Sequence, residues 1–159
     1  MNSPGSLIVA AILSLACAPM EAHAKVPLAT DRLPAALTGA RTVVDAFHQA
    51  LRSGNREAAL SLLADDALIY ESGHAEGKRQ YAAHHLDADI AFARQIPATI
   101  LKRTGGVSGP VAWITSEGRT TGTFKGKAVD LRTVETALFL KEAGAWKIVH
   151  LHWSSAAMK

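Results

Sequence analysis

Two titratable residues in this sequence are spaced for proton-transfer chemistry. His85 and Asp89 lie four residues apart in residues 77–95, a segment with no internal Gly or Pro that stops just before Pro97. The segment therefore predicts one helix, on which positions four apart are neighbours on its buried side. There a carboxylate can accept the imidazole proton and fix its tautomer, so the pair could remove or donate a proton. The alternative is a structural hydrogen bond that ties the helix to a strand.

Acidic residues also occur in segments whose side chains alternate with a period of two, as in strands. In residues 127–142 this period places Glu135 in a mostly apolar row with Phe139, an unusual position for an acid. By the same rule Glu71 shares a face with Ile69 at the end of an earlier strand. Each acid is either part of a buried site or a rim residue with access to water.

Two histidines stand two positions apart in the last expected strand, residues 145–155. The same alternation predicts that His150 and His152 project from one face, shared with Trp146 and Ile148. A rim position is again the alternative. Tyr81 and Phe92 fall on the same flank of the expected helix as His85, at 100° per residue. The candidate catalytic residues are therefore His85, Asp89 and Glu135, and the candidate ligand-binding residues are Glu71, Tyr81, Phe92, His150 and His152.

The histidine and carboxylate content also allows a zinc or copper site. The sequence contains no HExxH motif, and the imidazoles of His150 and His152 on one strand would be about 7 Å apart. The spacing therefore leaves metal binding open and assigns no metal ligand. Residues available for such a site are Glu71, His74, His84, His85, His150 and His152.

Other kinds of chemistry lack their motifs. The sequence contains no Gly-rich phosphate loop, Walker motif or GxSxG turn, so no nucleotide, nicotinamide or other cofactor is expected. The 17 Lys and Arg residues barely exceed the 14 Asp and Glu residues and are scattered, which argues against a nucleic-acid partner. A small-molecule ligand is the partner that the site residues favour.

The first two dozen residues are typical of a cleavable signal peptide. An apolar run, Leu7 to Ala18, is too short for a permanent membrane span, and Ala22-His23-Ala24 supplies the small-x-small pattern before Lys25. Cys17, the single cysteine, lies within this segment, so the mature chain would have no thiol nucleophile. We therefore expect a periplasmic or secreted protein with no membrane segment after processing.

The remaining chain predicts one α+β domain. The expected division is a signal peptide over 1–24, a linker over 25–37, the domain over 38–155 and a C-terminal tail over 156–159. Three helices are expected over residues 40–53, from 56 to before Asp65, and over 77–95. Strands are expected over 67–71, 97–103, 111–124, 127–142 and 145–155, with turns at 72–73, 104–106, 125–126 and 143–144. Three helices packed in a curved antiparallel sheet is the resulting architecture.

Four segments carry a family resemblance: AFHQALRSGN, AALSLLADDALIYESG, YAAHHLDADIAF and WKIVHLHWSS. Their order and spacing resemble the nuclear transport factor 2-like superfamily, and in particular its SnoaL-like branch, over Thr38 to Ser155. The resemblance implies a cone-shaped fold with an internal pocket and a homodimer formed through the sheet. The superfamily includes isomerases, dehydratases, epoxide hydrolases and noncatalytic binding domains, so the resemblance leaves the activity open.

Three functions follow as hypotheses. The first is an exported module that binds a small molecule in the conical pocket without an assigned reaction. The second is a cofactor-free isomerase, dehydratase or hydrolase in which His85 and Asp89 act with Glu135 or Glu71. The third is periplasmic binding of zinc or copper. All three predict that His85, Asp89, Glu135 and at least one of His150 and His152 converge in one cavity bordered by Tyr81 and Phe92.

Overall fold

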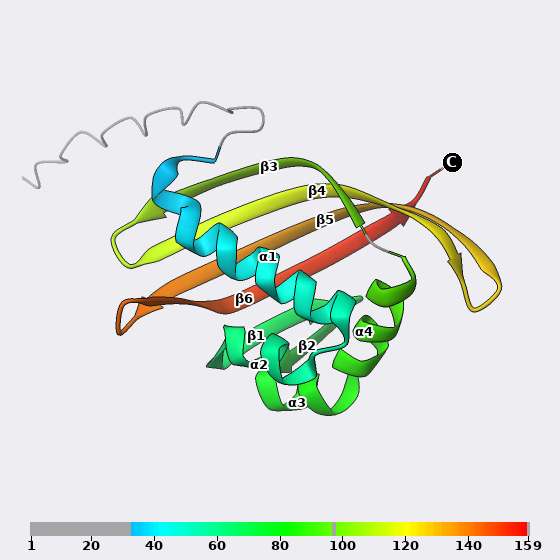
Figure 1. Ribbon diagram of the computed structural model, residues 1–159, viewed down its shortest axis with the longest axis horizontal. Helices are drawn as coiled ribbons and strands as arrows, with labels where there is room; N and C mark the ends of the chain where they lie inside the picture. The colour runs from blue at the N-terminus through cyan, green and yellow to red at the C-terminus, as the bar shows by residue number, and fades with distance from the viewer. Residues whose placement is uncertain (1–32, 97, 159) are drawn as a thin grey trace, which may run out of the picture.

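The structure is a computed structural model that describes residues 33–96 and 98–158 (Figure 1). The expected signal peptide over 1–24, and the expected linker up to residue 32, lie outside the described residues. A short 3-10 helix η1, Ala35–Leu37, leads into the first long helix. Within the described ranges no helix is long and apolar enough to span a membrane.

The first two helices follow the expected signals. Helix α1, Thr38–Ser53, ends where Gly54 adopts a left-handed conformation (φ 75°) and donates its N–H to the carbonyls of Ala50 and Leu51. Helix α2, Arg56–Leu62, begins after Asn55, whose side chain accepts the N–H of Ala58 at 2.9 Å. The glycine stop and the asparagine cap are confirmed.

The prediction of one helix over residues 77–95 is wrong. Residues Lys78–His84 form α3 and Leu86–Gln95 form α4, with His85 between them, while His74–Gly77 form a strand, β2. No glycine or proline marks this break. Tertiary contacts accompany it: the imidazole Nδ1 of His85 bonds to Glu76 of β2 at 2.6 Å, and Leu86 is fully buried.

Six strands form one curved sheet in the order β2-β1-β6-β5-β4-β3. All neighbours are antiparallel except β1 and β6, which are parallel. The strands β4 and β5 have the predicted bounds, and β6 continues two residues further. The bounds are β1 Leu63–Glu71, β2 His74–Gly77, β3 Ala98–Ser108, β4 Val111–Phe124, β5 Lys127–Glu142 and β6 Ala145–Ala157.

The turn expected at residues 104–106 is wrong, because β3 runs through it to Ser108. Gly105 and Gly106 serve close packing instead. A Cβ on Gly105 would lie 2.5 Å from the carbonyl oxygen of Trp113 and 2.8 Å from a methyl carbon of Leu37. Glycine inside a strand is typical of such close approaches.

The two faces of the sheet differ. Helix α1 lies across the concave face, and α2, α3 and α4 gather at the β1–β2 end (Figure 1). The core between them is fully buried: Val44 and Phe47 of α1 pack with Ile114, Phe139 and Leu151 of the sheet. On the outer face several large apolar side chains remain exposed, namely Leu68, Tyr70, Val111, Trp113 and Val134. The fold is thus the predicted α+β cone, with four α-helices instead of three over the described residues.

Candidate functional site

One register position of every strand contributes a side chain to a continuous row across the concave face. We call this set the polar row. Because directly paired residues project from the same face of a sheet, the pairings place these side chains side by side. In spatial order the row is His74 of β2, Glu71 of β1, Trp153 of β6, Glu135 of β5, Ser116 of β4 and Arg103 of β3.

Near the middle of the row, Glu135 forms a buried pair with a histidine of α1. One carboxylate oxygen, Oε2, lies 2.7 Å from His48 Nε2 and accepts the indole N–H of Trp153 at 2.6 Å. Only 7% of the Glu135 side chain is exposed. Burial by itself would raise the pKa of Glu135, but the charge and hydrogen bond of His48, with the indole and Arg103, lower it overall.

His48 is a site residue that sequence reasoning missed. It follows Phe47, which is fully buried, and lies four positions after Val44, also fully buried, so the helical period alone could have placed it beside the core. Glu135 does lie on the face with Ala137 and Phe139, as its strand period predicted. Its other oxygen, Oε1, is buried without a hydrogen-bond partner.

The other end of the row is an acidic cluster, which we define as Glu71, Glu76, Tyr81, His85 and Asp89. Tyr81, fully buried, donates its hydroxyl proton to Asp89 Oδ2 at 2.8 Å. Burial first, and then the charge of Glu71, raise the pKa of Asp89 to about 7. Burial also raises the pKa of Glu71, whose Oε2 atom has no hydrogen-bond partner. Two carboxyl groups with raised pKa values thus face one phenol.

His85 belongs to this cluster through a different partner from the expected one. Its Nδ1 lies 2.6 Å from Glu76 Oε2, while Nδ1 of His84 lies 3.2 Å from the other oxygen of Glu76. The hydrogen bond to Glu76 is the main cause that raises the pKa of His85. The predicted direct pair is therefore wrong: Asp89 bonds to Tyr81 and His85 to Glu76.

A narrow cavity lies in this cluster between β1, β2 and α3. It has no room for a water-sized sphere as its walls stand. His74 and His85 form part of the wall, and their imidazole rings are 5.7 Å apart. The lining residues are Ile69, Glu71, His74, Glu76, Tyr81 and His85. A ligand can therefore enter only if side chains of the wall move. Of these side chains, His74 is exposed to solvent.

His150 and His152 lie on the outer face of the sheet, away from Glu135. The cause is an irregularity in the β5–β6 pairing, where Leu138 pairs with His150 but the next residue, Phe139, pairs with Ile148. This bulge reverses the alternation, so that Ile148 remains on the buried face but His150 does not. Both imidazoles pack against Tyr70, at ring distances of 4.9 and 6.3 Å.

The predicted single cavity is therefore wrong. Tyr81 borders the acidic cavity, but Phe92 packs against Phe124 at a ring distance of 5.1 Å and does not line it. Trp153 separates the acidic cluster from Glu135: its ring lies 6.4 Å from that of Tyr81 on one side, and its indole N–H bonds to Glu135 on the other. Two polar centres occupy the concave face instead of one.

The metal hypothesis finds no support in the described part of the chain. Over residues 33–96 and 98–158, no three or more side chains of His, Cys, Asp or Glu are grouped so that they could hold a metal ion. His150 and His152 lie on the outer face, and His74 and His85 lie near the acidic cavity. The expected candidates are thus divided between opposite faces of the sheet.

Three solved structures with similar folds are described by their likeness to this chain. A candidate ketosteroid isomerase from Shewanella frigidimarina NCIMB 400 is 37% identical, with a TM-score of 0.70 over 74% of this chain and 95% of that one. A candidate dehydratase of the NTF2-like family from Streptomyces avermitilis is 19% identical (TM-score 0.66, 77% and 97% covered). A CaMKII hub from S. rosetta is 21% identical (TM-score 0.64, 74% and 95% covered). The last two show the fold alone.

Comparison of the sequence with known protein families identifies the family of this chain. A search of curated proteins finds no match. The family model of the SnoaL-like domain, however, matches residues 40–158, which include every helix from the third residue of α1 onward and all six strands. The chain therefore belongs to the SnoaL-like domain family, within the nuclear transport factor 2-like superfamily.

Proposed function

We propose that the protein binds a small molecule at the acidic cluster. The observation that carries this proposal is the Oε2 atom of Glu71, which is buried, has no hydrogen-bond partner and belongs to a residue that lines the cavity. An unsatisfied buried acceptor costs about 1–3 kcal/mol. A ligand that donates a hydrogen bond to this oxygen would recover that free energy on binding.

The chemistry of the cavity indicates the class of ligand. Its polar walls are carboxyl groups of Glu71 and Glu76, the phenol of Tyr81 and the imidazoles of His74 and His85. Carboxylate oxygens accept hydrogen bonds only, so they favour a hydroxyl or a protonated amine. The narrowness of the cavity, which holds no water-sized sphere as its walls stand, favours a compact molecule or one end of a longer one.

The test begins with the protein recovered from its own cells. Native mass spectrometry identifies a bound compound, and calorimetry then measures its affinity for the wild type and for Glu71→Gln. Glu57→Gln is the matched control, because Glu57 lies in the first turn of α2, outside the cluster. We expect weaker binding for Glu71→Gln and unchanged binding for Glu57→Gln. Equal affinity in all three proteins would exclude Glu71 as the binding group.

Catalysis by proton transfer is the second candidate function, and a specific observation favours it. The pKa of Asp89, about 7, lies where a general acid or base works best at neutral pH. Tyr81 donates a hydrogen bond to this carboxyl group, and Glu71 lies close enough for its charge to raise the same pKa. In this reaction Asp89 would take a proton from a substrate carbon and return it elsewhere, while Tyr81 stabilises the carboxylate.

Two similar proteins make the reaction class concrete. The 37% identical structure is described as a candidate ketosteroid isomerase and a more distant one as a candidate dehydratase. Both reactions begin with removal of a proton beside an activating group. Exchange of deuterium into a small ketone, followed by NMR, tests this step: Asp89→Asn should abolish the exchange and Glu57→Gln should preserve it. Exchange at the buffer rate in the wild type would remove the catalytic proposal.

The outer face of the sheet supports assembly into a homodimer. Tyr70, Trp113 and Val134 expose 39%, 37% and 44% of their surfaces there, although large apolar side chains are normally covered. A second copy of the same face would cover them. Light scattering at micromolar concentration should give twice the chain mass, and Val134→Glu should reduce it to one. A monomeric wild type would contradict the dimer.

The sequence before the described residues supports export. The apolar run followed by Ala22-His23-Ala24 favours cleavage before Lys25, which would give a periplasmic or secreted mature protein. Edman sequencing of protein from the cell envelope or medium should begin at Lys25. An intact chain that begins at Met1 and stays in the cytoplasm would contradict this proposal.

A further inference from the structure

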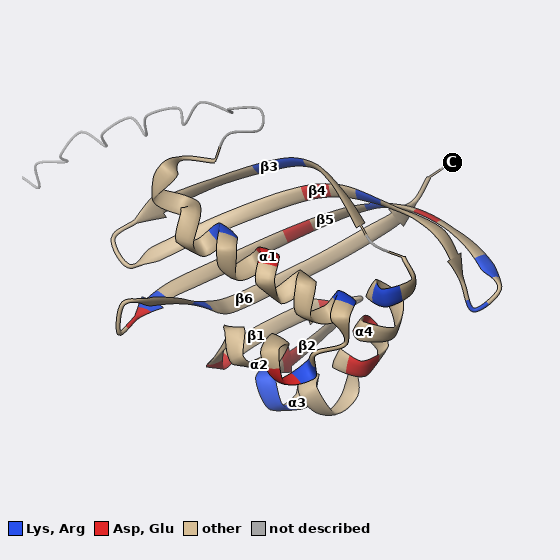
Figure 2. Cartoon of the chain, in the orientation of Figure 1, with Lys and Arg blue, Asp and Glu red and all other residues tan. Residues whose placement is uncertain are grey.

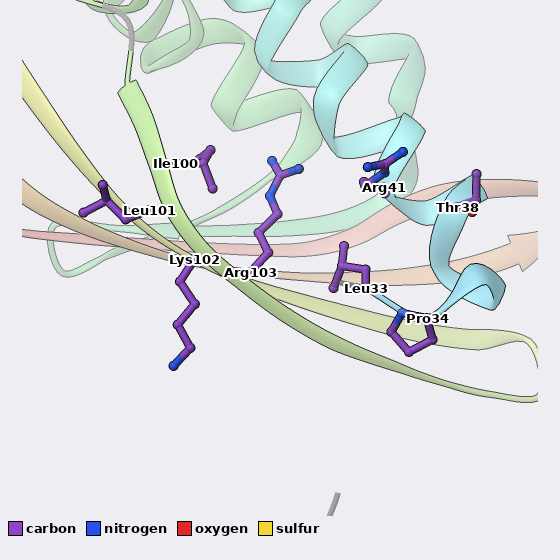
Figure 3. Close-up of a pocket in the computed structure, with 8 residues that line it drawn as sticks. All are labelled: Leu33, Pro34, Thr38, Arg41, Ile100, Leu101, Lys102 and Arg103. Carbon is purple, nitrogen blue, oxygen red and sulfur yellow. The ribbon is translucent and has the colours of Figure 1, made fainter. Parts of the chain in front are cut away.

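A second and larger cleft lies at the opposite end of the polar row from the acidic cluster. It is formed by η1, the beginning of α1 and the edge strand β3, and its volume is about 380 Å³ (Figure 3). That size falls within the range of small-molecule sites, about 300–1,000 Å³. The lining residues are Leu33, Pro34, Thr38, Arg41, Ile100, Leu101, Lys102 and Arg103.

The charge of this lining is entirely positive. Figure 3 shows Arg103 pointing from β3 toward α1, where Arg41 lies, and Lys102 pointing to the other side of the strand. Lys102 has a partner there, since its Nζ is 3.4 Å from Glu117 Oε1. Arg41, in contrast, has no salt-bridge partner among the described residues and is exposed. Among the described residues, the cationic groups that face the cleft are therefore two guanidinium groups, of which that of Arg103 also pairs with Asp45 of α1.

The guanidinium group of Arg103 is fixed in place by contacts with neighbouring elements. Its Nη1 bonds to Asp45 of α1 at 2.6 Å, its Nε donates to Ser116 Oγ at 3.2 Å, and only 14% of the side chain is exposed. These contacts fix the guanidinium plane, so binding would cost little side-chain entropy. Among the described residues Nη2 has no hydrogen-bond partner, so its N–H groups are the donors of this guanidinium that remain for an anion.

Apolar side chains form the rest of the cleft. Leu33 and Pro34 line it from the chain that enters η1, and Ile100 points to the same side of β3 as Arg103 (Figure 3). Ile100 is 45% exposed, although β-branched apolar residues are normally buried. A ligand with one anionic end and a hydrocarbon portion matches both halves of this surface.

We propose that this cleft binds an amphipathic organic acid, whose carboxylate lies between Arg41 and Arg103 and whose hydrocarbon chain covers Leu33 and Ile100. The cleft is distinct from the acidic cluster, which would repel the same ligand. In Figure 2 blue segments lie on β3 and near the beginning of α1, and red segments lie further along α1 and on the neighbouring strands β4 and β5. The proposal stands independently of the function proposed for the acidic cluster.

Calorimetric titration of the whole protein with octanoate tests this proposal, with 1-octanol as the uncharged probe of equal length. We expect saturable binding of octanoate only, and at least a tenfold loss of affinity in Arg41→Gln. Arg79→Gln is the matched control, because Arg79 is an exposed arginine of α3 that does not line the cleft. It should bind octanoate as the wild type does, and so should Glu71→Gln. Thermal melts verify that each variant is folded.

Four results would overturn the proposal. One is the absence of saturable heat with octanoate, and another is equal affinity for 1-octanol, which would indicate apolar adsorption alone. The third is unchanged affinity in Arg41→Gln. Loss of octanoate binding in Glu71→Gln would also contradict it, because it would place the ligand at the acidic cluster. Failure of the acidic-cluster proposal leaves the octanoate result unaffected, so the two outcomes are distinguishable.

Discussion

Glu71 and Glu135 lie on the same face of the sheet, each paired in register with Trp153, and yet their pKa values shift in opposite directions. Glu135 is almost completely buried, and its pKa is lowered. Glu71 is only partly buried, and its pKa is raised. Depth of burial alone would predict a higher pKa for Glu135. The difference between them lies in their hydrogen-bond partners.

Glu135 has two partners on one oxygen, His48 and the indole of Trp153, which stabilise its charged form. Glu71 has no partner on its buried oxygen, and the neighbouring charge of Glu76 also raises its pKa. Each acid has one buried oxygen without a partner, but the two hydrogen bonds on the other oxygen of Glu135 stabilise its charged form, whereas burial of Glu71 is not offset in this way. This contrast assigns a structural role to the centre of the polar row and a binding role to its acidic end.

The largest effect should come from removing the histidine that faces Glu135. His48→Ala leaves the buried carboxylate of Glu135 without its imidazole hydrogen bond, so we expect the free energy of unfolding to fall by about 3 kcal/mol at pH 7. Urea denaturation followed by circular dichroism measures it. Gln49→Ala, the neighbouring exposed position, is the control and should change stability by less than about 0.5 kcal/mol.

The pH dependence gives a second readout for the same variant. Because the folded pKa of Glu135 is below its ordinary value of 4.5, its contribution to stability is present above pH 4.5 and disappears as the pH falls through the folded pKa. The difference between wild type and His48→Ala should therefore shrink in acid. A loss of stability that is the same at pH 3 and pH 7 would show that His48 acts by packing and not by charge.

A smaller loss should follow from Trp153→Phe. This change removes the indole N–H that binds Glu135 and keeps an aromatic ring, which stacks on Phe47 at 6.1 Å in the wild type. A hydrogen bond to a charged group contributes about 1.5–3 kcal/mol, so we expect a loss of about 2 kcal/mol. Trp146→Phe is the control, because no hydrogen bond from that indole is present in the described part of the chain. Equal losses in both variants would contradict the assignment.

A substitution at the acidic end of the polar row should raise the stability of the protein instead of lowering it. Glu71→Gln removes a carboxylate that burial destabilises, and we expect the protein to gain about 1 kcal/mol at pH 8. Since the folded pKa of Glu71 is above 4.5, its cost is absent below that pH and grows as the pH rises through the folded pKa. The two proteins should therefore have similar stability at pH 4. Destabilisation by Glu71→Gln at pH 8 would show that Glu71 is a structural acid like Glu135.

Local signals predicted those parts of the fold that depend on local chemistry. Gly54 and Asn55 fixed the boundary between α1 and α2, and Lys125-Gly126 joins β4 and β5 with positive φ at both residues, as a two-residue hairpin turn requires. The alternation of β5 placed Glu135 on the concave face. These features need no knowledge of distant residues.

The missed features all depend on contacts between distant segments. The bulge at Val149 reverses the sides of β6, so a strict period of two put His150 and His152 on the wrong face. His85 bonds to Glu76 of β2 instead of Asp89, although the Asp89 N–H still donates to the His85 carbonyl as in a helix. His48 and Glu135 are 87 residues apart in the sequence and meet only because α1 packs over β5. A one-residue irregularity thus redirects every side chain that follows it.

The smallest expected effect concerns the titration of Asp89, which reports directly on its neighbours in the acidic cluster. Carbon-13 NMR of the carboxyl group should give a midpoint near 7 in the wild type, because burial and then the charge of Glu71 raise the pKa. Glu71→Gln should lower the midpoint, since it removes that charge. Tyr81→Phe should raise it, since the phenol stabilises the charged carboxylate. Glu57→Gln should leave it unchanged. Opposite shifts in two variants cannot come from a common loss of structure, which would move both midpoints toward the ordinary value of 3.8. A wild-type midpoint near 4 would instead remove Asp89 as the acid–base group and leave Glu71 as a binding residue alone.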